Sequence, residues 1–388
     1  MVQKKLITRC CRPAVWLLAV MPLLFQVGCE KVPTFGELTG GQSTDAPAQA
    51  APAQGNPQPA AQPAPKPQTP TGPSPQEVIA KFKETPGHRI SNAQLATIAA
   101  LPAGSGAETF TELSLGASQV DDNGMAHLVK FTNLEVLKLG RMQNLTNAGL
   151  AALASLPKLR EVDLNTTVVN GTGLANLQRA STLQSINLQG TGVTDADLAP
   201  LAGLTNLQII NLNESRITDG GFQHFANMPQ LSQVHASRTS ISGVGFANVK
   251  AVETMSVIIA DNTRFDAEGM KAISRFKNLT TLDLAQTRIN DLTTKPLSGM
   301  KKMQNLNLAY LNVTLKTTAH MKGMKQLQSL NMFNARGVNG LAIKNLINCK
   351  ELKNLNIDGT ACVINDITAI QNYVPAVVVR WKGRDYRK

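Results

Sequence analysis

The chain has 388 residues, of which 43% are hydrophobic and 16% charged, a composition that excludes a wholly disordered protein. Lysine and arginine number 38 against 26 acidic residues, and the resulting net charge of +12 makes anionic partners worth testing. An aromatic content of 4% disfavours a protein that stacks nucleic-acid bases, and five cysteines are too few for a disulfide scaffold.

Residues 1–29 have the layout of a secretory signal. Four basic residues, Lys4, Lys5, Arg9 and Arg12, precede an apolar run of 15 residues from Ala14 to Gly28. This run is short for a membrane-spanning helix, which needs about 20 residues. The pattern therefore predicts export.

The run ends in Gln26-Val27-Gly28-Cys29, which resembles the signal of bacterial lipoproteins. The resemblance implies that Cys29 is lipidated and that the chain is held at a membrane of the cell envelope. By the same resemblance, Glu30 rather than Asp after the cysteine favours sorting to the outer membrane in a bacterium that has two membranes. Gln26 stands where the lipoprotein pattern prefers Leu, so an uncleaved anchor, ordinary cleavage or a cytosolic chain stay open as alternatives.

Residues 30–75 are assigned to a linker rich in Pro, Ala and Gln. From Gly40 to about Pro75 the residues are almost all Ala, Pro, Gln, Gly, Ser and Thr, which cannot build a hydrophobic core. Such composition predicts an extended tether of roughly 3 Å per residue. A proline ligand for an SH3-type domain is the alternative.

A repeat fills the remainder of the chain. The template Leu-x-x-Leu-x-Leu recurs, and we number its first apolar residue as position 1 of each repeat. These first residues are 24 or 25 residues apart and lie at Phe110, Leu134, Leu159, Leu183, Leu207, Leu231, Met255, Leu279, Met303, Leu327, Leu352 and Ala376. Apolar residues also recur at positions 16, 19 and 22, as in Leu198, Leu201 and Leu204.

Each repeat predicts one short strand followed by one short helix. Apolar residues that alternate with other residues around positions 4 and 6 are typical of a strand. Apolar residues at every third position from 16 to 22 are typical of a helix with one apolar stripe. Neither element covers its own apolar face, so stacked repeats are expected to bury both. Asp195, Asp219 and Asp291 at position 13 are expected to cap the helices.

These repeats resemble the leucine-rich repeat family in its 24-residue bacterial form, whose motif T-x-I-T-D-x-G-L is matched at Thr191-Gly192-Val193-Thr194-Asp195. The resemblance implies an α/β solenoid, a curved horseshoe with a parallel sheet on its concave face and short helices on its convex face. Family members usually carry Asn at position 9. Ser or Thr takes that place in eight repeats here, so we expect a hydroxyl ladder instead.

The repeat domain is assigned to residues 110–383, with about 12 repeats. Residues 76–109 are expected to form a helical cap over the open N-terminal end, using Val78, Ile79 and Phe82. At the other end, Ala376 to Trp381 predicts a last lone strand, and residues 384–388 are assigned to a basic tail.

No motif indicates catalysis, a metal or a cofactor. The five histidines are scattered over different repeats without metal-ligand spacing and are expected at the surface. Cys349 and Cys362 fall on inward positions and are expected to be buried thiols. There is no G-x-S-x-G motif and no phosphate-binding loop. We therefore expect a protein that is not an enzyme.

Side chains at positions 3, 5 and 7 are expected to point away from the core. Position 5 is Asn or Asp in seven repeats, and these residues together with Phe333 form the candidate binding face: Asp163, Asn187, Asn211, Asp283, Asn307, Asn331, Phe333 and Asn356. Such a row suits hydrogen bonding to a peptide or glycan. Stacked side-chain amides can equally satisfy one another, so a purely structural role stays open. Tyr310 adds aromatic surface, and Val257 and Ile259 add an apolar spot.

A basic excess lies in the C-terminal half, where sixteen bases face seven acids between Lys250 and Lys353. Six of its lysines are expected on the convex and edge surfaces: Lys295, Lys301, Lys302, Lys316, Lys322 and Lys325. A solvated face is one interpretation. Attraction to an anionic envelope polymer or membrane surface, weakened by salt, is the other.

These features predict an exported, lipid-anchored binding or scaffold protein. The leucine-rich repeat resemblance implies a protein ligand. A glycan or cell-wall polymer binder is the alternative, and a secreted host-directed effector is another that would need a further catalytic or adaptor module. We expect no nucleic-acid ligand.

Overall fold

The computed structural model describes residues 72–388, and residues 73–388 form one compact unit. The predicted signal sequence, the lipidation site Cys29 and the linker up to residue 71 lie outside the described residues. Within residues 72–388, no helix is both long and apolar enough to cross a membrane.

Short strands recur once per repeat and form a single 13-stranded sheet over residues 72–388. They are β1 (Glu112–Ser114), β2 (Val136–Lys138), β3 (Glu161–Asp163), β4 (Ser185–Asn187), β5 (Ile209–Asn211), β6 (Gln233–His235), β7 (Val257–Ile259), β8 (Thr281–Asp283), β9 (Asn305–Asn307), β10 (Ser329–Asn331), β11 (Asn354–Asn356), β12 (Val378–Trp381) and β13 (Arg384–Tyr386).

Helical segments return the chain from one strand to the next. The α-helices are α1 (Pro75–Glu84), α2 (Asn92–Ala99), α3 (Asp122–Ala126), α4 (Gly171–Leu174), α5 (Ala267–Ile273), α6 (Leu315–His320), α7 (Gly340–Lys344) and α8 (Ile364–Tyr373). The 3₁₀ helices are η1 (Gly87–Arg89), η2 (Ala107–Thr109), η3 (His127–Lys130), η4 (Gly149–Ser155), η5 (Ala175–Leu177), η6 (Ala196–Gly203), η7 (Asp219–Phe225), η8 (Val244–Asn248) and η9 (Lys295–Gly299). Apolar residues spaced by three favour 3₁₀ geometry, which has three residues per turn.

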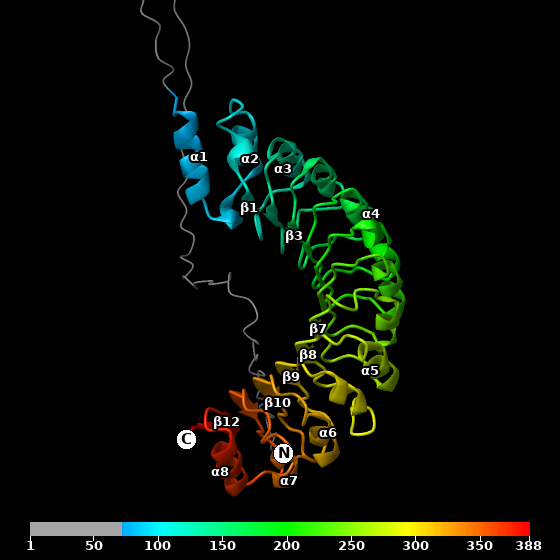
Figure 1. Cartoon of the computed structure of the whole chain (residues 1–388). Coiled ribbons are helices and arrows are strands. Elements are labelled where there is room, and N and C mark those ends of the chain that lie inside the picture. The colour runs from blue at the N-terminus through cyan, green and yellow to red at the C-terminus, as the bar shows by residue number, and fades with distance from the viewer. Residues whose placement is uncertain (1–71) are drawn as a thin grey trace, which may run out of the picture. The chain divides into compact units, whose positions relative to one another are not determined.

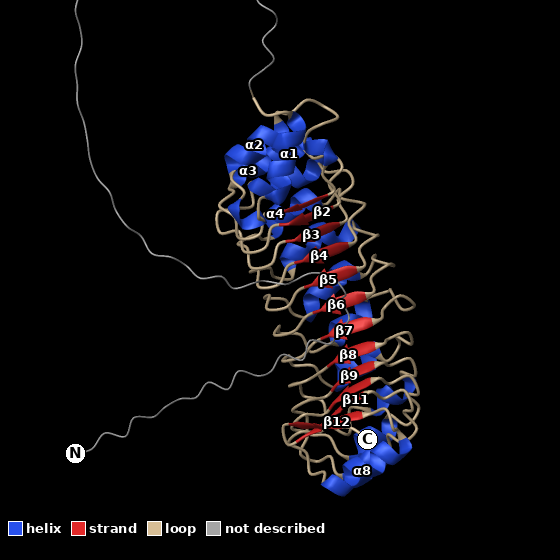
Figure 2. Cartoon of the chain, turned by 90° about the vertical axis from the view of Figure 1, so that its left-hand side faces the viewer, coloured by secondary structure: helices blue, strands red, loops and turns tan. Residues whose placement is uncertain are grey.

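The sheet follows chain order, with β1 to β12 parallel and in register. Position 4 pairs with position 4, as in Leu137 with Val162 and Val162 with Ile186. The strands line the concave side of the repeat array and the helices its convex side (Figures 1 and 2). The predicted α/β solenoid is therefore confirmed.

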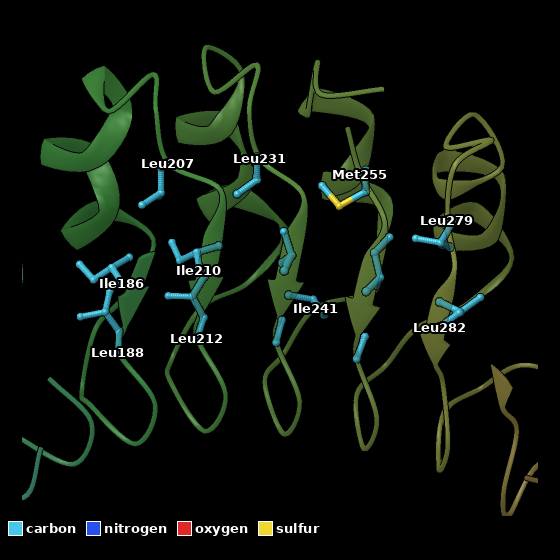
Figure 3. Packing of buried hydrophobic residues seen from close by; sticks show 14 of the residues in the cluster. Ile186, Leu188, Leu207, Ile210, Leu212, Leu231, Ile241, Met255, Leu279 and Leu282 are labelled. Atoms are coloured by element: carbon cyan, nitrogen blue, oxygen red, sulfur yellow. The ribbon is translucent and has the colours of Figure 1, made fainter. Parts of the chain in front are cut away.

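The core lies between the sheet and the helices and runs through all the repeats. Leu207, Ile210 and Leu212 of one repeat point inward beside Leu231 of the next, and all four are fully buried (Figure 3). Burying one such side chain contributes about 1.5–3 kcal/mol. Because each repeat contacts its neighbours, this contribution depends on stacking.

Helices close the N-terminal end of the solenoid. Ser74 caps α1 and Ser91 caps α2, each in a capping box. Phe82 of α1 is buried and stacks edge-on against Phe110 at 5.4 Å between ring centroids, while Val78 and Ile79 pack at the border of the core. The N-terminal end of the core, next to the first strand β1, is thus covered by α1.

The C-terminal end differs from the sequence expectation. Residues 384–388 were assigned to a basic tail, yet Arg384–Tyr386 form β13, which pairs antiparallel with β12. Glycine at position 383 adopts a left-handed turn with φ of 72°, and Asp358 accepts a hydrogen bond from its backbone N–H. Tyr386 then packs on Trp381. The hairpin covers the edge that a lone last strand would leave open.

The carboxylates at position 13 do not cap their own helices, so that expectation is wrong. Asp195 accepts the backbone N–H of Thr218, Asp219 that of Ser242, and Asp291 that of Thr314, at 2.7–2.9 Å. Each acceptor reaches the helix start of the following repeat, 23 residues later. The carboxylate is therefore a clamp between repeats.

Hydroxyl groups at position 9 serve their own repeat. Thr167, Thr191 and Ser215 donate to the position 6 carbonyl of the same repeat at 2.6–2.7 Å. These hydroxyls thus satisfy a backbone group of the turn in repeat after repeat, as expected for residues that take the place of the family's Asn. The residue before position 9 is left-handed in every full repeat. Where position 9 carries a hydroxyl, as after Thr166 and Glu214, its hydrogen bond closes the turn.

Candidate binding surface on the concave sheet

The sheet register brings the position 5 residues into one row. Asp163 pairs with Asn187 and Asn187 with Asn211, and further along the sheet Asn307 pairs with Asn331 and Asn331 with Asn356. His235 and Ile259 interrupt the row between Asn211 and Asp283. The seven predicted residues are thus brought together, in two blocks.

One side-chain oxygen of each of these Asn and Asp residues has a structural partner. It accepts the backbone N–H of the residue two positions later, for example from Gln189 to Asn187 at 3.1 Å and from Phe333 to Asn331 at 3.0 Å. The same bond recurs at Asp163, Asn211, Asp283, Asn307 and Asn356. It satisfies an N–H at the end of the strand, so the oxygen belongs to the scaffold.

The remaining atoms of the row differ in what they offer a ligand. Asn356 and Asp163 are only 2% and 9% exposed, and Asn165 donates to both oxygens of Asp163. Asn307 donates to Asp283 at 2.9 Å. The Nδ2 group of half-buried Asn331 has no hydrogen bond within residues 72–388 and faces the concave side as a donor.

An aromatic pair lies at the C-terminal part of this surface. Tyr310, 45% exposed, stacks edge-on against half-buried Phe333 at 5.1 Å between ring centroids. Phe333 occupies position 7 and Tyr310 the left-handed position 8 of the preceding repeat. By contrast, the apolar spot expected at Val257 and Ile259 is small, because Val257 is buried.

An acidic site in the middle of the sheet joins Asp283, which the sequence pattern predicted, to Asp261, which it did not. Burial, and then the charge of Asp261, raises the pKa of Asp283 to about 6. Ser237 donates its hydroxyl to Asp261. Next to them, burial lowers the pKa of His235, whose Nε2 is enclosed without a hydrogen-bond partner among the described residues. The sequence signal that could have revealed Ser237 and Asp261 is that both occupy position 7 of neighbouring repeats, where side chains point away from the core.

The other reactive side chains stay apart. Cys349 and Cys362 are buried, as expected, and burial raises the pKa of Cys349 to about 11. His235 is half-buried with its Nε2 enclosed, whereas His88 is exposed. Within residues 72–388, no group of histidines, cysteines and carboxylates is arranged to hold a metal ion.

Comparison with known proteins establishes the fold. No family model and no curated protein matches the sequence. The structure is similar to that of an internalin from Listeria monocytogenes, with a TM-score of 0.52 and 16% identity over 80% of this chain and 95% of that one. It is also similar to internalin C2 from the same species, with a TM-score of 0.46 and 21% identity over 58% and 93% of the two chains. A leucine-rich repeat protein from Leptospira interrogans gives 0.41 and 13% over 70% and 84%. The chain has the leucine-rich repeat fold.

Proposed function

We propose that this chain is a non-catalytic binding protein of the cell envelope and that its concave sheet takes a protein ligand. The observation that carries the proposal is the exposed Tyr310, stacked on Phe333 beside the amide donor of Asn331. Aromatic anchors next to polar donors are typical of the centre of protein interfaces. The surrounding sheet is held by its own hydrogen bonds, so little ordering is needed on binding.

The envelope part of the proposal is supported by the sequence of residues 1–29. A basic start, an apolar run and a cysteine together favour an exported lipoprotein. The proline-rich residues that follow would let the solenoid reach away from its anchor. No helix of residues 72–388 offers a competing membrane span.

The first prediction concerns the aromatic pair. With the full chain as bait in a cross-linking pull-down from envelope extracts, Tyr310→Asn combined with Phe333→Ser should reduce capture of the partner about 30-fold, the loss typical of one interface hot spot. Asn tolerates the left-handed backbone of position 310, where φ is 62°, so the fold is kept. Quantitative mass spectrometry of the captured protein measures the effect.

Two further variants make the result specific. Asn331→Asp keeps the oxygen that accepts the Phe333 N–H and removes the outward amide donor. It therefore tests the role of that donor in binding without removing the hydrogen bond that holds the strand end. The triple change Lys301→Gln, Lys302→Gln and Lys325→Gln alters exposed residues away from the concave row and should leave capture unchanged. Loss of the partner with the lysine variant alone would contradict a concave site. Binding to a sugar array that the aromatic variant abolishes would replace the protein ligand by a glycan.

A further inference from the structure

Exposed aliphatic side chains form a line on the convex side of repeats 8 to 11. Leu292, Leu341 and Ile364 are 85%, 57% and 47% exposed, and Leu315 is 40% exposed. Leu292 precedes η9, and the others are the first or second residues of α6, α7 and α8. These elements contact one another in order, and α6, α7 and α8 follow one another along the outer side of the array (Figure 1).

This placement is peculiar to the C-terminal repeats. Earlier repeats carry small or acidic residues where the helical segment begins, for example Asp122, Gly171 and Asp219. Val244 in the sixth repeat is an isolated exception at 45% exposure. The core does not need the four aliphatic residues, because each repeat already buries its own inward set.

Lysines stand among these aliphatic residues. Lys295 begins η9, Lys316 is the second residue of α6 and Lys344 ends α7, and all three are exposed. Within residues 72–388, none of the three forms an ion pair or a side-chain hydrogen bond. We call Leu292, Leu315, Leu341 and Ile364 with these three lysines the apolar–basic edge.

The charge around the edge is net positive. From residue 284 to residue 366, the range that the edge spans, the chain holds eleven lysines and arginines and four acids, Asp291, Glu351, Asp358 and Asp366. Asp291 is occupied by Thr314 and Thr317 of the next repeat, and Asp366 accepts the backbone N–H of Val363 at the start of α8. The basic residues outnumber the acids, so the potential of this surface is positive on balance.

We propose that the apolar–basic edge docks on an anionic phospholipid bilayer, with the aliphatic side chains entering the headgroup boundary and the lysines binding lipid phosphates. Aliphatic residues interspersed with lysine are the composition of membrane-surface elements. Protein interfaces are instead depleted in lysine and enriched in aromatic residues and arginine. Tyr373, the exposed aromatic residue of α8, lies at the opposite end of that helix from Ile364 and is covered on one face by Lys350. A convex row also encloses no peptide.

The test measures partition of residues 73–388, the compact unit through which the core runs, onto vesicles by sedimentation. This protein lacks Cys29 and the apolar run from Ala14 to Gly28, so neither an acyl chain nor that run contributes. The vesicles contain phosphatidylglycerol and phosphatidylcholine in equal parts or phosphatidylcholine alone. Binding should require phosphatidylglycerol and weaken as salt is raised. Replacing Lys295, Lys316 and Lys344 by Gln should lower the partition coefficient about 100-fold, at roughly fivefold per lysine.

A matched control separates the edge from net charge. Lys130→Gln, Arg179→Gln and Lys250→Gln remove the same charge from exposed positions in other repeats and should change partition less than about twofold, because distant charges are screened. Leu292→Gln, Leu341→Gln and Ile364→Gln should also abolish most binding. Equal losses in the control and in the edge lysine variant, or no loss with the aliphatic variant, would overturn the proposal.

A local readout places the contact. Leu341→Trp should show an emission blue-shift with phosphatidylglycerol vesicles and quenching by brominated lipid. Val168→Trp, at a site 67% exposed in the third repeat, should show neither. Quenching at position 168 and none at position 341 would assign membrane contact to another surface and overturn the proposal.

Discussion

Asp283 shows how a single residue in a repeated position acquires a property that its neighbours lack. One oxygen of Asp283 accepts the N–H of Ala285. Every other Asn or Asp of the row makes the equivalent bond with the residue two positions after it. Asp283 is, however, close to a second carboxylate, Asp261, which follows the adjacent strand β7, and burial together with the charge of Asp261 raises its pKa to about 6. The folded state therefore holds a proton that the unfolded chain, with a pKa near 3.8, releases between these two values.

Asp283→Asn should therefore stabilise the protein in a pH-dependent way. Because the folded-state pKa is raised, the contribution of Asp283 to stability is present below about pH 4 and is lost as pH rises through about 6. At pH 7.5 the variant should be more stable than wild type by about 1–3 kcal/mol, and at pH 4 the two should be equal. Urea unfolding at both pH values measures this difference. A stability difference that is the same at both pH values would show that the carboxyl group is not perturbed.

The helical elements depend on their neighbours through the carboxylate clamp. Thr218 caps η7 with its own hydroxyl, which leaves Asp219 free to serve the next repeat. Asp219 accepts the backbone N–H groups of Ser242, Gly243 and Gly245 at 2.9–3.0 Å. A short helix is marginal alone, so this clamp joins the stability of η8 to that of η7.

Replacing this carboxylate should be costly. Asp219→Ala leaves three backbone donors without their acceptor and should lower the unfolding free energy by about 2–4 kcal/mol. Glu214→Ala, which removes only an exposed ion pair with Arg238, should cost at most about 1 kcal/mol. Thermal and urea unfolding compare the two variants. Similar losses for both would mean that the clamp contributes no more than a surface pair.

At the scale of residues 73–388, one repeat array presents two separate surfaces. The concave row with Tyr310 and Phe333 belongs to the sheet, and the apolar–basic edge belongs to the helical layer of repeats 8 to 11. Bilayer docking by the edge and ligand binding by the sheet are thus compatible in one molecule.

The anchor is the prediction that concerns the whole chain. If Cys29 is acylated, labelled palmitate should enter the wild-type protein in cells and should be absent from Cys29→Ser. The apolar–basic edge alone gives only reversible, salt-sensitive attachment, whereas added acyl chains hold the protein in a salt-resistant membrane fraction. Fractionation of both proteins with a salt wash distinguishes these states. An unlabelled wild type would remove the lipoprotein assignment and leave the repeat fold untouched.

Sequence periodicity was sufficient to predict the solenoid and the direction of its side chains. Apolar residues at positions 1, 4 and 6 have one way to be buried, so strand, helix and concave row follow from local pattern. The pattern also predicted that Asn331 and Phe333 share the concave face. These features depend on residues within one repeat or on its exact repetition.

Contacts between repeats, by contrast, were decided by tertiary structure. The position 13 carboxylates face the next repeat because strand register sets neighbouring helix starts side by side, which no single repeat reveals. Leu292 and Leu341 lie outside the inward positions 16, 19 and 22, and the stacking of their repeats leaves them exposed at the helical elements on either side of α6. The pairing of Asp261 with Asp283, and the turn that folds Arg384–Tyr386 onto β12, likewise arise only when separate strands meet. Burial and electrostatic coupling are properties of neighbours in space, and a linear pattern specifies only neighbours in the chain.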